Sequence, residues 1–207
     1  MKIILVGYPG SQKIVPITKI LLEKYMPEYE LVWLNYTGPV DEWSKFNADY
    51  LKSIDDELVI FTLDDYLIAE KVSGVGRARE LIEKDVKCVR LLTSERKGEQ
   101  LNYSVTAQYN LWDRLALIDV LEHTKDPWDF EINGTRYFDS KGWKTWGFTE
   151  PIVRYSDCSA LSTRHPGKIN VLELNDDDIK LVLKYYNEED LILGQKRGDP
   201  VLWKDSL

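Results

Sequence analysis

The sequence has few of the residues that mark secreted, nucleic-acid-binding or membrane proteins. Among its 207 residues are two cysteines, Cys88 and Cys158, which lie far apart and match no metal-ligand or redox spacing. They imply no disulfide framework, and we expect buried free thiols in a reducing compartment. The formal net charge of −8 leaves no basic excess for nonspecific binding to nucleic acid or to an anionic membrane.

Long apolar runs, repeats and linkers are absent as well. The apolar segment from Met1 to Gly7 is too short for a signal sequence or a membrane span, so we expect a cytoplasmic protein without a transmembrane helix. Without an internal repeat, a low-complexity tract or a convincing linker, the chain is expected to form a single domain around one sizeable core.

The glycine-rich nucleotide motifs are incomplete. In Gly7-Tyr8-Pro9-Gly10-Ser11-Gln12-Lys13, Gln12 stands where a P-loop needs its second glycine, and Ile14 stands where it needs a hydroxyl. The segment Gly74-Val75-Gly76-Arg77 lacks the third glycine of a dinucleotide-binding motif. A P-loop NTPase and a dinucleotide enzyme are therefore disfavoured, although the turn after Gly7 would allow close backbone approach to a base or ribose.

What the sequence does contain is an alternation of strand and helix patterns. Repeated βαβ units of this length predict a mainly parallel central sheet with helices on both faces. In the first half we predict strands at 2–6, 30–34, 58–63 and 88–92 and helices at 14–25, 42–54 and 76–84. In the second half we predict a helix at 109–123, a new element at Pro127, an aromatic-lined loop at 136–149, a strand at 168–174 and a helix at 177–186.

The most informative motif is a pair of carboxylates, Asp64 and Asp65, directly after the third predicted strand. Ligands of open α/β sheets bind at the carboxyl ends of strands, and carboxylate oxygens suit Mg²⁺ or Mn²⁺ beside a phosphate. The simpler interpretation is a strand that ends in turn-forming residues. Two other acidic runs are explained by their positions, because 55–57 precedes a strand and 176–178 opens a helix.

Several of these motifs resemble glycosyltransferases of the GT-A fold. The resemblance lies in the first strand and its turn, the second strand ending at Asn35, and the third ending in Asp-Asp. Leu63-Asp64-Asp65-Tyr66, Asn110-Leu111-Trp112-Asp113-Arg114 and Pro127-Trp128-Asp129-Phe130-Glu131 resemble segments of capsule-type sugar transferases and of the capsid-glycan glycosyltransferases of large algal DNA viruses (chloroviruses). The chain departs from a strict Asp-x-Asp motif, because Thr62 stands where the earlier aspartate would be.

The resemblance, which spans about residues 1–175, implies an α/β, GT-A-like (Rossmann-like) domain over 1–207. Residues 1–95 would be its nucleotide-binding half, 96–175 its acceptor-side half, and 176–207 a C-terminal helix and tail. It implies a metal-dependent glycosyltransferase of the hexosyl type that uses Mn²⁺ or Mg²⁺ and a nucleotide-sugar donor, with UDP-sugar the commonest type. The implied acceptor is a glycan or glycoprotein, such as a viral capsid glycoprotein, and further domains of a longer polypeptide could accompany the chain. A viral enzyme would work in the host cytoplasm.

The same resemblance implies roles for the polar residues at the donor site. We expect Asp65 to ligate the metal and Asp64 to contact ribose or to support the ligand, because adjacent strand-end side chains point in opposite directions. His165 is a candidate further ligand. For Arg77 the alternative is an ordinary solvated helix charge. The candidate nucleotide-sugar contacts are Gly7, Tyr8, Pro9, Ser11, Asn35, Asp64, Arg77, Arg164 and Lys168.

An inverting transfer also needs a base for the acceptor hydroxyl. Asp129 and Glu131 are the candidates, and at most one is expected to be catalytic; helix capping is the alternative for Asp129. Trp128, Trp143 and Trp146 could stack on sugars or belong to the core.

Other functions remain open from the sequence. A sugar-phosphate nucleotidyltransferase would share the metal site, but residues 7–13 do not reproduce its usual glycine-rich opening, which ends in Arg and Lys. In a non-enzymatic α/β nucleotide-binding or interaction module, the Asp pair would be only a turn.

Overall fold

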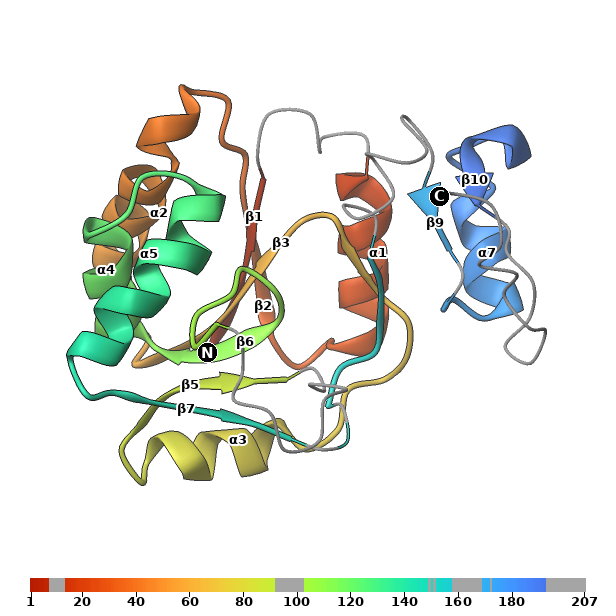
Figure 1. Cartoon of the computed structure of the whole chain (residues 1–207). Helices are drawn as coiled ribbons and strands as arrows, with labels where there is room; N and C mark the ends of the chain where they lie inside the picture. The colour runs from red at the N-terminus through yellow and green to blue at the C-terminus, as the bar shows by residue number, and fades with distance from the viewer. Residues whose placement is uncertain are drawn as a thin grey trace, which may run out of the picture.

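A six-stranded sheet with the order β2-β1-β3-β6-β5-β7 forms the centre of the computed structural model (Figure 1). The structure describes residues 1–7, 14–91, 103–148, 150, 152–157, 169–171 and 173–192. Within this sheet only β6 runs antiparallel to its neighbours, so the predicted mainly parallel sheet is confirmed. The strands are β1 (Lys2–Val6), β2 (Glu30–Leu34), β3 (Leu58–Leu63), β5 (Val86–Arg90), β6 (Asn110–Asp113) and β7 (Lys144–Gly147).

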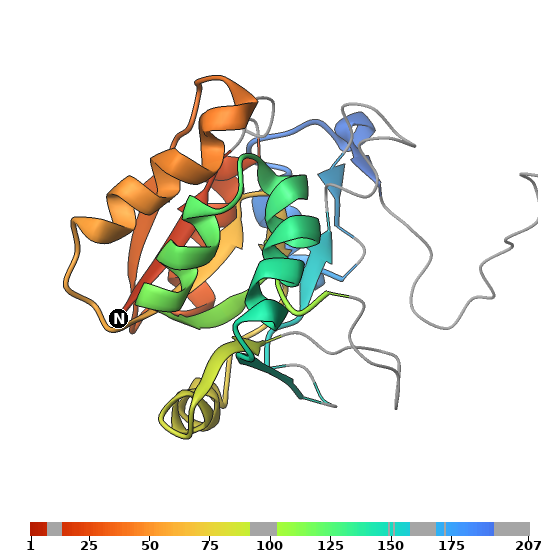
Figure 2. The same ribbon diagram turned by 60° about the vertical axis from the view of Figure 1, so that its left-hand side comes forward.

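Helices cover both faces of the sheet, as predicted (Figures 1 and 2). On one face α2 (Trp43–Lys52), α4 (Arg114–Glu122) and α5 (Pro127–Ser140) pack together, and α1 (Val15–Tyr25) and α3 (Val75–Ile82) lie on the other. In the described segments, no helix combines the length and the apolar character needed to cross a bilayer. The smaller elements are η1 (Val40–Glu42), β4 (Tyr66–Ile68), β8 (Tyr155–Asp157), β9 (Ile169–Asn170), α7 (Asp176–Val182), η2 (Glu188–Asp190) and β10 (Leu191–Ile192).

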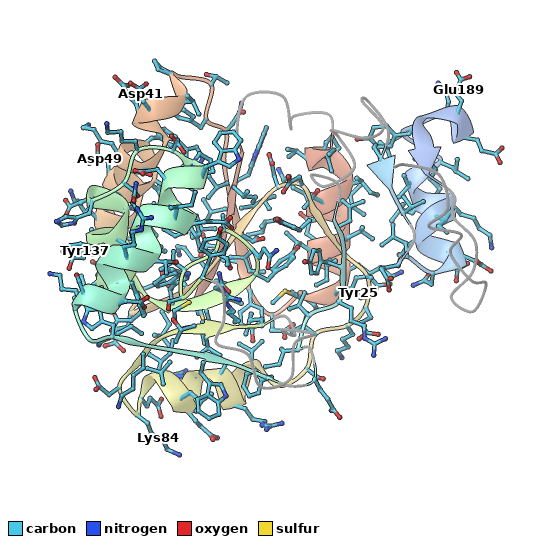
Figure 3. The ribbon with its side chains drawn as sticks, in the orientation of Figure 1. Tyr25, Asp41, Asp49, Lys84, Tyr137 and Glu189 are labelled. Atoms are coloured by element: carbon cyan, nitrogen blue, oxygen red, sulfur yellow. The ribbon has the colours of Figure 1, made fainter. Side chains whose placement is uncertain are left out.

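An aromatic core fixes α5 against the sheet. Its side chains are fully buried, and neighbouring ring centroids lie between 5.8 and 6.2 Å apart. Such tilted and edge-to-face ring pairs add stabilisation beyond the burial of apolar area. Charged side chains such as Asp41, Asp49, Lys84 and Glu189 lie at the periphery (Figure 3). The aromatic core that fixes α5 consists of the rings of Trp43, Phe61, Trp112, Phe130 and Phe138.

The helix predicted over 109–123 is wrong at its start. Residues Asn110–Asp113 form β6, and the helix begins only at Arg114. Asp113 is the N-cap, because its carboxylate accepts hydrogen bonds from the backbone N–H groups of Leu115 at 3.0 Å and Ala116 at 3.1 Å. A short strand covered on both faces has no polar alternation, so its pattern resembles the buried side of a helix.

The aromatic-lined loop predicted over 136–149 is also wrong. Residues up to Ser140 complete α5, and Lys144–Gly147 form β7, which pairs in parallel with β5 at the edge of the sheet. Phe138 is buried in the core, and Trp143 packs on it at 5.5 Å between ring centroids. These aromatic side chains therefore hold α5 in place and do not line a loop over a pocket.

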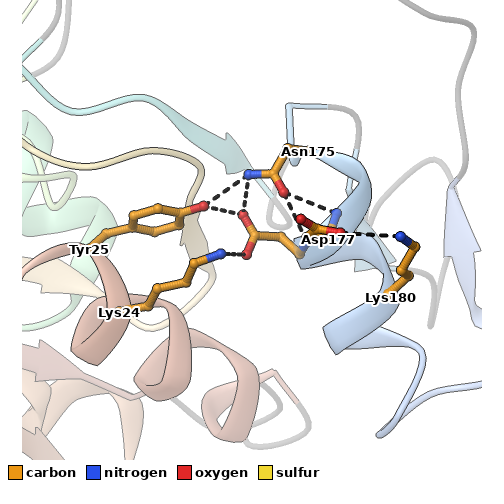
Figure 4. Close-up of polar contacts among 6 residues, drawn as sticks. Lys24, Tyr25, Asn175, Asp177 and Lys180 are labelled. Atoms are coloured by element: carbon orange, nitrogen blue, oxygen red, sulfur yellow. Dashed lines mark hydrogen bonds and ion pairs between the residues drawn. The ribbon is translucent and has the colours of Figure 1, made fainter.

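A buried polar network joins α7 to α1 (Figure 4). The fully buried Asp178 carboxylate accepts hydrogen bonds from Lys24 Nζ at 2.7 Å, from the Tyr25 hydroxyl and from Asn175 Nδ2 at 2.7 Å. Asn175 also caps α7, because its Oδ1 accepts from the backbone N–H groups of Asp177 and Asp178. These donors offset the cost of removing a carboxylate from water.

Replacing Asp178 by alanine is expected to lower the free energy of unfolding by about 2 kcal/mol, because it leaves the partners of a buried carboxylate unsatisfied. The matched control is Asp177→Ala in the same helical turn, where the exposed side chain pairs with Lys180. Urea denaturation followed by tryptophan fluorescence measures both. Equal midpoints for the two variants would show that the network adds nothing to stability.

Candidate functional site

The carboxyl ends of β1, β2 and β3 meet at one edge of the sheet. The backbone N–H of Gly7 donates to Leu34 O at 2.9 Å, and the N–H of Asp64 donates to Val6 O at 3.0 Å. These bonds extend the strand pairing by one residue on each side of β1. Gly7 and Asp64 are therefore held next to each other, where the sequence predicts the ligand site.

The missing side chain of Gly7 leaves room for the Asp64 carboxylate. A Cβ on residue 7 would lie 2.9 Å from Asp64 Oδ2, closer than real Cβ atoms approach another heavy atom, and 3.4 Å from Trp33 Nε1. Trp33 Nε1 is buried and has no acceptor among the described residues. The indole N–H of Trp33 and a carboxylate oxygen of Asp64 thus both border the space beside the Gly7 Cα. Trp33 was not among the site residues predicted from the sequence.

Asp64 and Asp65 form the turn between β3 and β4, yet their side chains are only 0% and 1% exposed. The Asp64 carbonyl also accepts a hydrogen bond from Thr18 Oγ1 of α1 at 2.8 Å. A turn needs no buried carboxylates, and removing them from water is unfavourable unless charges or donors compensate. Most aspartates in turns lie at the surface, so burial distinguishes this pair from an ordinary surface turn.

The donor set at this edge fits Mg²⁺ or Mn²⁺ bound together with a diphosphate. Among the described residues, no group of three or more His, Cys, Asp or Glu side chains could hold a metal ion. A single carboxylate such as Asp65 is compatible with a site of this kind, because Mg²⁺ commonly takes one or two carboxylates and completes its shell with substrate phosphates and water. His165, the further predicted ligand, lies outside the described residues.

Glu131 of α5 is linked to the same edge through one residue. Its Oε1 accepts a hydrogen bond from Ala107 N at 3.0 Å, and Ala107 O accepts one from Leu63 N at 2.9 Å. Leu63 directly precedes the Asp pair. The first turns of α5 also lie at the end of the sheet where β1 and β3 finish (Figure 1). The structure thus brings one of the two predicted bases towards the carboxylates.

Asp129, the other predicted base, takes part in the start of α5. Asp126 is the N-cap and accepts from Asp129 N at 2.8 Å, and Asp129 Oδ2 accepts from Lys125 N at 2.9 Å. Asn133 donates to its other oxygen. Positions two apart on a helix are about 200° apart around the axis, so Asp129 and Glu131 point in different directions. The contacts of Asp129 match the capping alternative.

Arg90 and Asn110 are polar residues at this edge that the sequence analysis missed. Asn110 of β6 pairs in register with Phe61 on one side and with Arg90 on the other, so the three side chains share the face that α5 covers. Burial lowers the pKa of the Arg90 guanidinium, and the nearby Glu131 carboxylate opposes that shift. In the described part of the chain, Arg90 Nε and Asn110 Oδ1 are buried without a hydrogen-bond partner.

The remaining candidates lie next to Leu34 at the end of β2, on α3, or outside the described residues. Asn35 is exposed just after β2. Arg77 lies in the first turn of α3, with its guanidinium 5.3 Å from the centroid of the Phe148 ring. Cys88 is buried, and burial raises the pKa of its thiol. Tyr8, Pro9, Ser11, Cys158, Arg164, His165 and Lys168 lie outside the described residues.

Comparison with known proteins adds similarities of fold. No protein-family model matches the sequence, and no curated protein matches it. Among solved structures, A197 from STIV is similar at 13% identity and a TM-score of 0.49, over 76% of this chain and 85% of that one. A glycosyltransferase involved in the glycosylation of the major capsid of PBCV-1 is similar at 12% identity and a TM-score of 0.46, over 86% and 89%.

A third similar structure is TarS of S. aureus in complex with UDP, at 14% identity and a TM-score of 0.44. The match covers 75% of this chain but 60% of that one, so the chain spans less than two thirds of the TarS structure. The comparison therefore includes glycosyltransferases, the class that the sequence motifs resemble. At these identities and TM-scores, the similarity is one of fold.

Replacing Gly7 by alanine is expected to destabilise the protein by roughly 1–3 kcal/mol, because the new methyl group would displace the Asp64 carboxylate. Gly76→Ala in α3 is the matched control: its Cβ would meet nothing within 4 Å, and alanine favours a helix. Thermal unfolding of both variants, of Asp64→Ala and of Gly7→Ala/Asp64→Ala measures the effect. The double variant should lose less than the sum of its single changes, and strict additivity would rule out the steric conflict.

Proposed function

We propose that this chain is a metal-dependent glycosyltransferase that transfers a sugar from a nucleotide-diphosphate sugar to a glycan acceptor. The observation that carries the proposal is the burial of Asp64 and Asp65 at the carboxyl end of β3. This end lies beside Gly7 at the end of β1, where no side chain competes with the Asp64 carboxylate for space. UDP-sugar is the first donor to test, because it is the donor that the sequence motifs imply.

On the donor side, Asp65 is proposed to bind the cation directly. Asp64 is proposed either to contact the ribose or to support Asp65, the metal ligand. Mg²⁺ or Mn²⁺, when bound, would offset the negative charge that develops on the departing diphosphate. The absence of a side chain at Gly7 lets the Asp64 carboxylate lie against the end of β1. The buried Trp33 N–H beside Asp64 is a further donor for an oxygen of the nucleotide.

On the acceptor side, Glu131 is proposed to accept the proton of the attacking hydroxyl in an inverting transfer. The Ala107 N–H orients its carboxylate, at 3.0 Å from Oε1. The Arg90 guanidinium is close enough for the Glu131 carboxylate to favour its charged form against the effect of burial. In this proposal Asp129 stabilises the start of α5 and has no part in the chemistry.

Isothermal titration calorimetry with UDP and UDP-glucose tests the donor site. Binding is expected with Mn²⁺ and is expected to disappear with EDTA. Asp65→Ala should weaken Mn²⁺-dependent binding by about tenfold or more with the fold retained. Asp55→Ala, an exposed residue before β3, is the control and should bind as the wild type does. Binding that is insensitive to both EDTA and Asp65→Ala would refute the metal site.

Glu131→Gln and Asp129→Asn separate the base from the cap. Release of UDP from UDP-glucose is expected to fall by about 10²–10⁴-fold in Glu131→Gln, with UDP affinity unchanged. Asp129→Asn should retain turnover and lose some stability. Equal turnover in Glu131→Gln and the wild type would exclude Glu131 as the base. Pyrophosphate release from UTP and glucose 1-phosphate would instead identify a sugar-phosphate nucleotidyltransferase.

A further inference from the structure

Beside Glu131, α5 presents large apolar side chains to solvent. Trp128 is 65% exposed and Ile132 is 44% exposed. Ile132 is four residues and Glu131 three residues after Trp128, so each of them is a neighbour of Trp128 on the helix surface. The exposed apolar strip therefore borders the carboxylate that is linked to the end of β3.

The strip is not explained by packing within the described chain. Trp43 and Trp112 are fully buried, and Trp143 packs against Phe138. In the described residues, no aromatic ring or cation stacks on Trp128, whereas Lys19 lies over Trp33 at 5.5 Å and Lys141 lies over Trp143. An indole exposed next to a candidate catalytic carboxylate offers a flat surface on which a ligand can stack.

A polar row borders the strip on its other side. Asn133 Nδ2 donates to Asp129 Oδ1, and Arg136 donates from a terminal guanidinium nitrogen to Asn133 Oδ1 at 2.9 Å. Trp128 and Ile132 thus lie between this row and Glu131. A flat apolar ring edged by hydrogen-bonding groups complements a pyranose, which has an apolar C–H face and hydroxyl groups around its rim.

The size of the strip also favours a sugar over a protein partner. Specific protein interfaces bury about 800 Å² on each side, far more than two side chains can provide. One indole and its flanking polar groups are enough to cover a single sugar ring. The chemistry and the size therefore indicate the same occupant.

We propose that the Trp128–Ile132 strip of α5 is the acceptor site and that its occupant is a sugar ring of a saccharide acceptor, stacked on the Trp128 indole. This inference rests on the proposed function. An acceptor hydroxyl directed at Glu131 gives its proton to the carboxylate while its oxygen forms a bond to C1 of the donor sugar. The bond from C1 to the diphosphate oxygen breaks, and its electron pair leaves with the nucleoside diphosphate.

The test compares Trp128→Ala with Trp146→Ala, since Trp146 of β7 is also a strongly exposed tryptophan, at 50%. The probes are the methyl β-glycosides of glucose, galactose and N-acetylglucosamine, and binding is measured by saturation-transfer NMR. Trp128→Ala is expected to weaken saccharide binding about tenfold, and Trp146→Ala to leave it unchanged. Trp128→Phe should recover part of the binding, because it restores an aromatic face.

Parallel calorimetry with UDP and Mn²⁺ separates this inference from the proposed function. UDP affinity should be the same in the wild type and in all three variants. Two outcomes with normal UDP binding would overturn only the acceptor site. In the first, Trp128→Ala keeps full saccharide binding; in the second, Trp128→Ala and Trp146→Ala lose saccharide binding to the same extent. The same holds if none of the saccharides binds the wild type. If UDP fails to bind the wild type, the proposed function itself fails.

Discussion

Two buried adjacent carboxylates at the end of β3 are the constraint on which the site depends. Each ionised carboxylate that leaves water loses several kcal/mol of hydration, which surrounding donors or cations must replace. The neighbouring chain segments are arranged to accommodate this: residue 7 has no side chain where Asp64 lies, and the Asp64 backbone bonds to β1 and α1. A sheet edge organised in this way is suited to a cation and a phosphate.

The aromatic core gives the second half of the site its position. Phe130 packs on Trp43, Phe61 and Trp112, so the first turns of α5 cannot shift without disturbing the centre of the domain. Glu131 is the next residue along the helix. A carboxylate carried by such a firmly packed helix is preorganised, which reduces the reorganisation needed during a reaction.

The first half of the fold could be predicted because its signals are local. Apolar runs of strand length alternate with helical patterns, and Asp64 and Asp65 lie at a strand end that can be recognised without a structure. The link from Glu131 through Ala107 to Leu63 could not be predicted, since it joins residues far apart in sequence through backbone atoms. Arg90 was missed because the predicted strand continued to residue 92, which hid its position at the strand end.

The second half misled the sequence analysis where burial erased the pattern. Leu111 and Trp112 are both buried, on opposite faces of β6, so the strand shows no polar alternation and was merged with the helix that follows. In 136–149 the number of aromatic residues suggested a ligand surface, but Phe138 and Trp143 pack on each other. Aromatic content alone does not separate a core from a binding surface.

The central position of β6 has a consequence for how the protein is made. β5 is not paired with β1, β2 or β3; it reaches them only through β6, which is synthesised later. A nascent chain that ends before Asn110 therefore has β3 with one open edge and β5 without a partner in this sheet. Such open edges are prone to wrong pairing. Strands β1, β2 and β3 therefore join β5 in one sheet only after residues 110–113 have been synthesised.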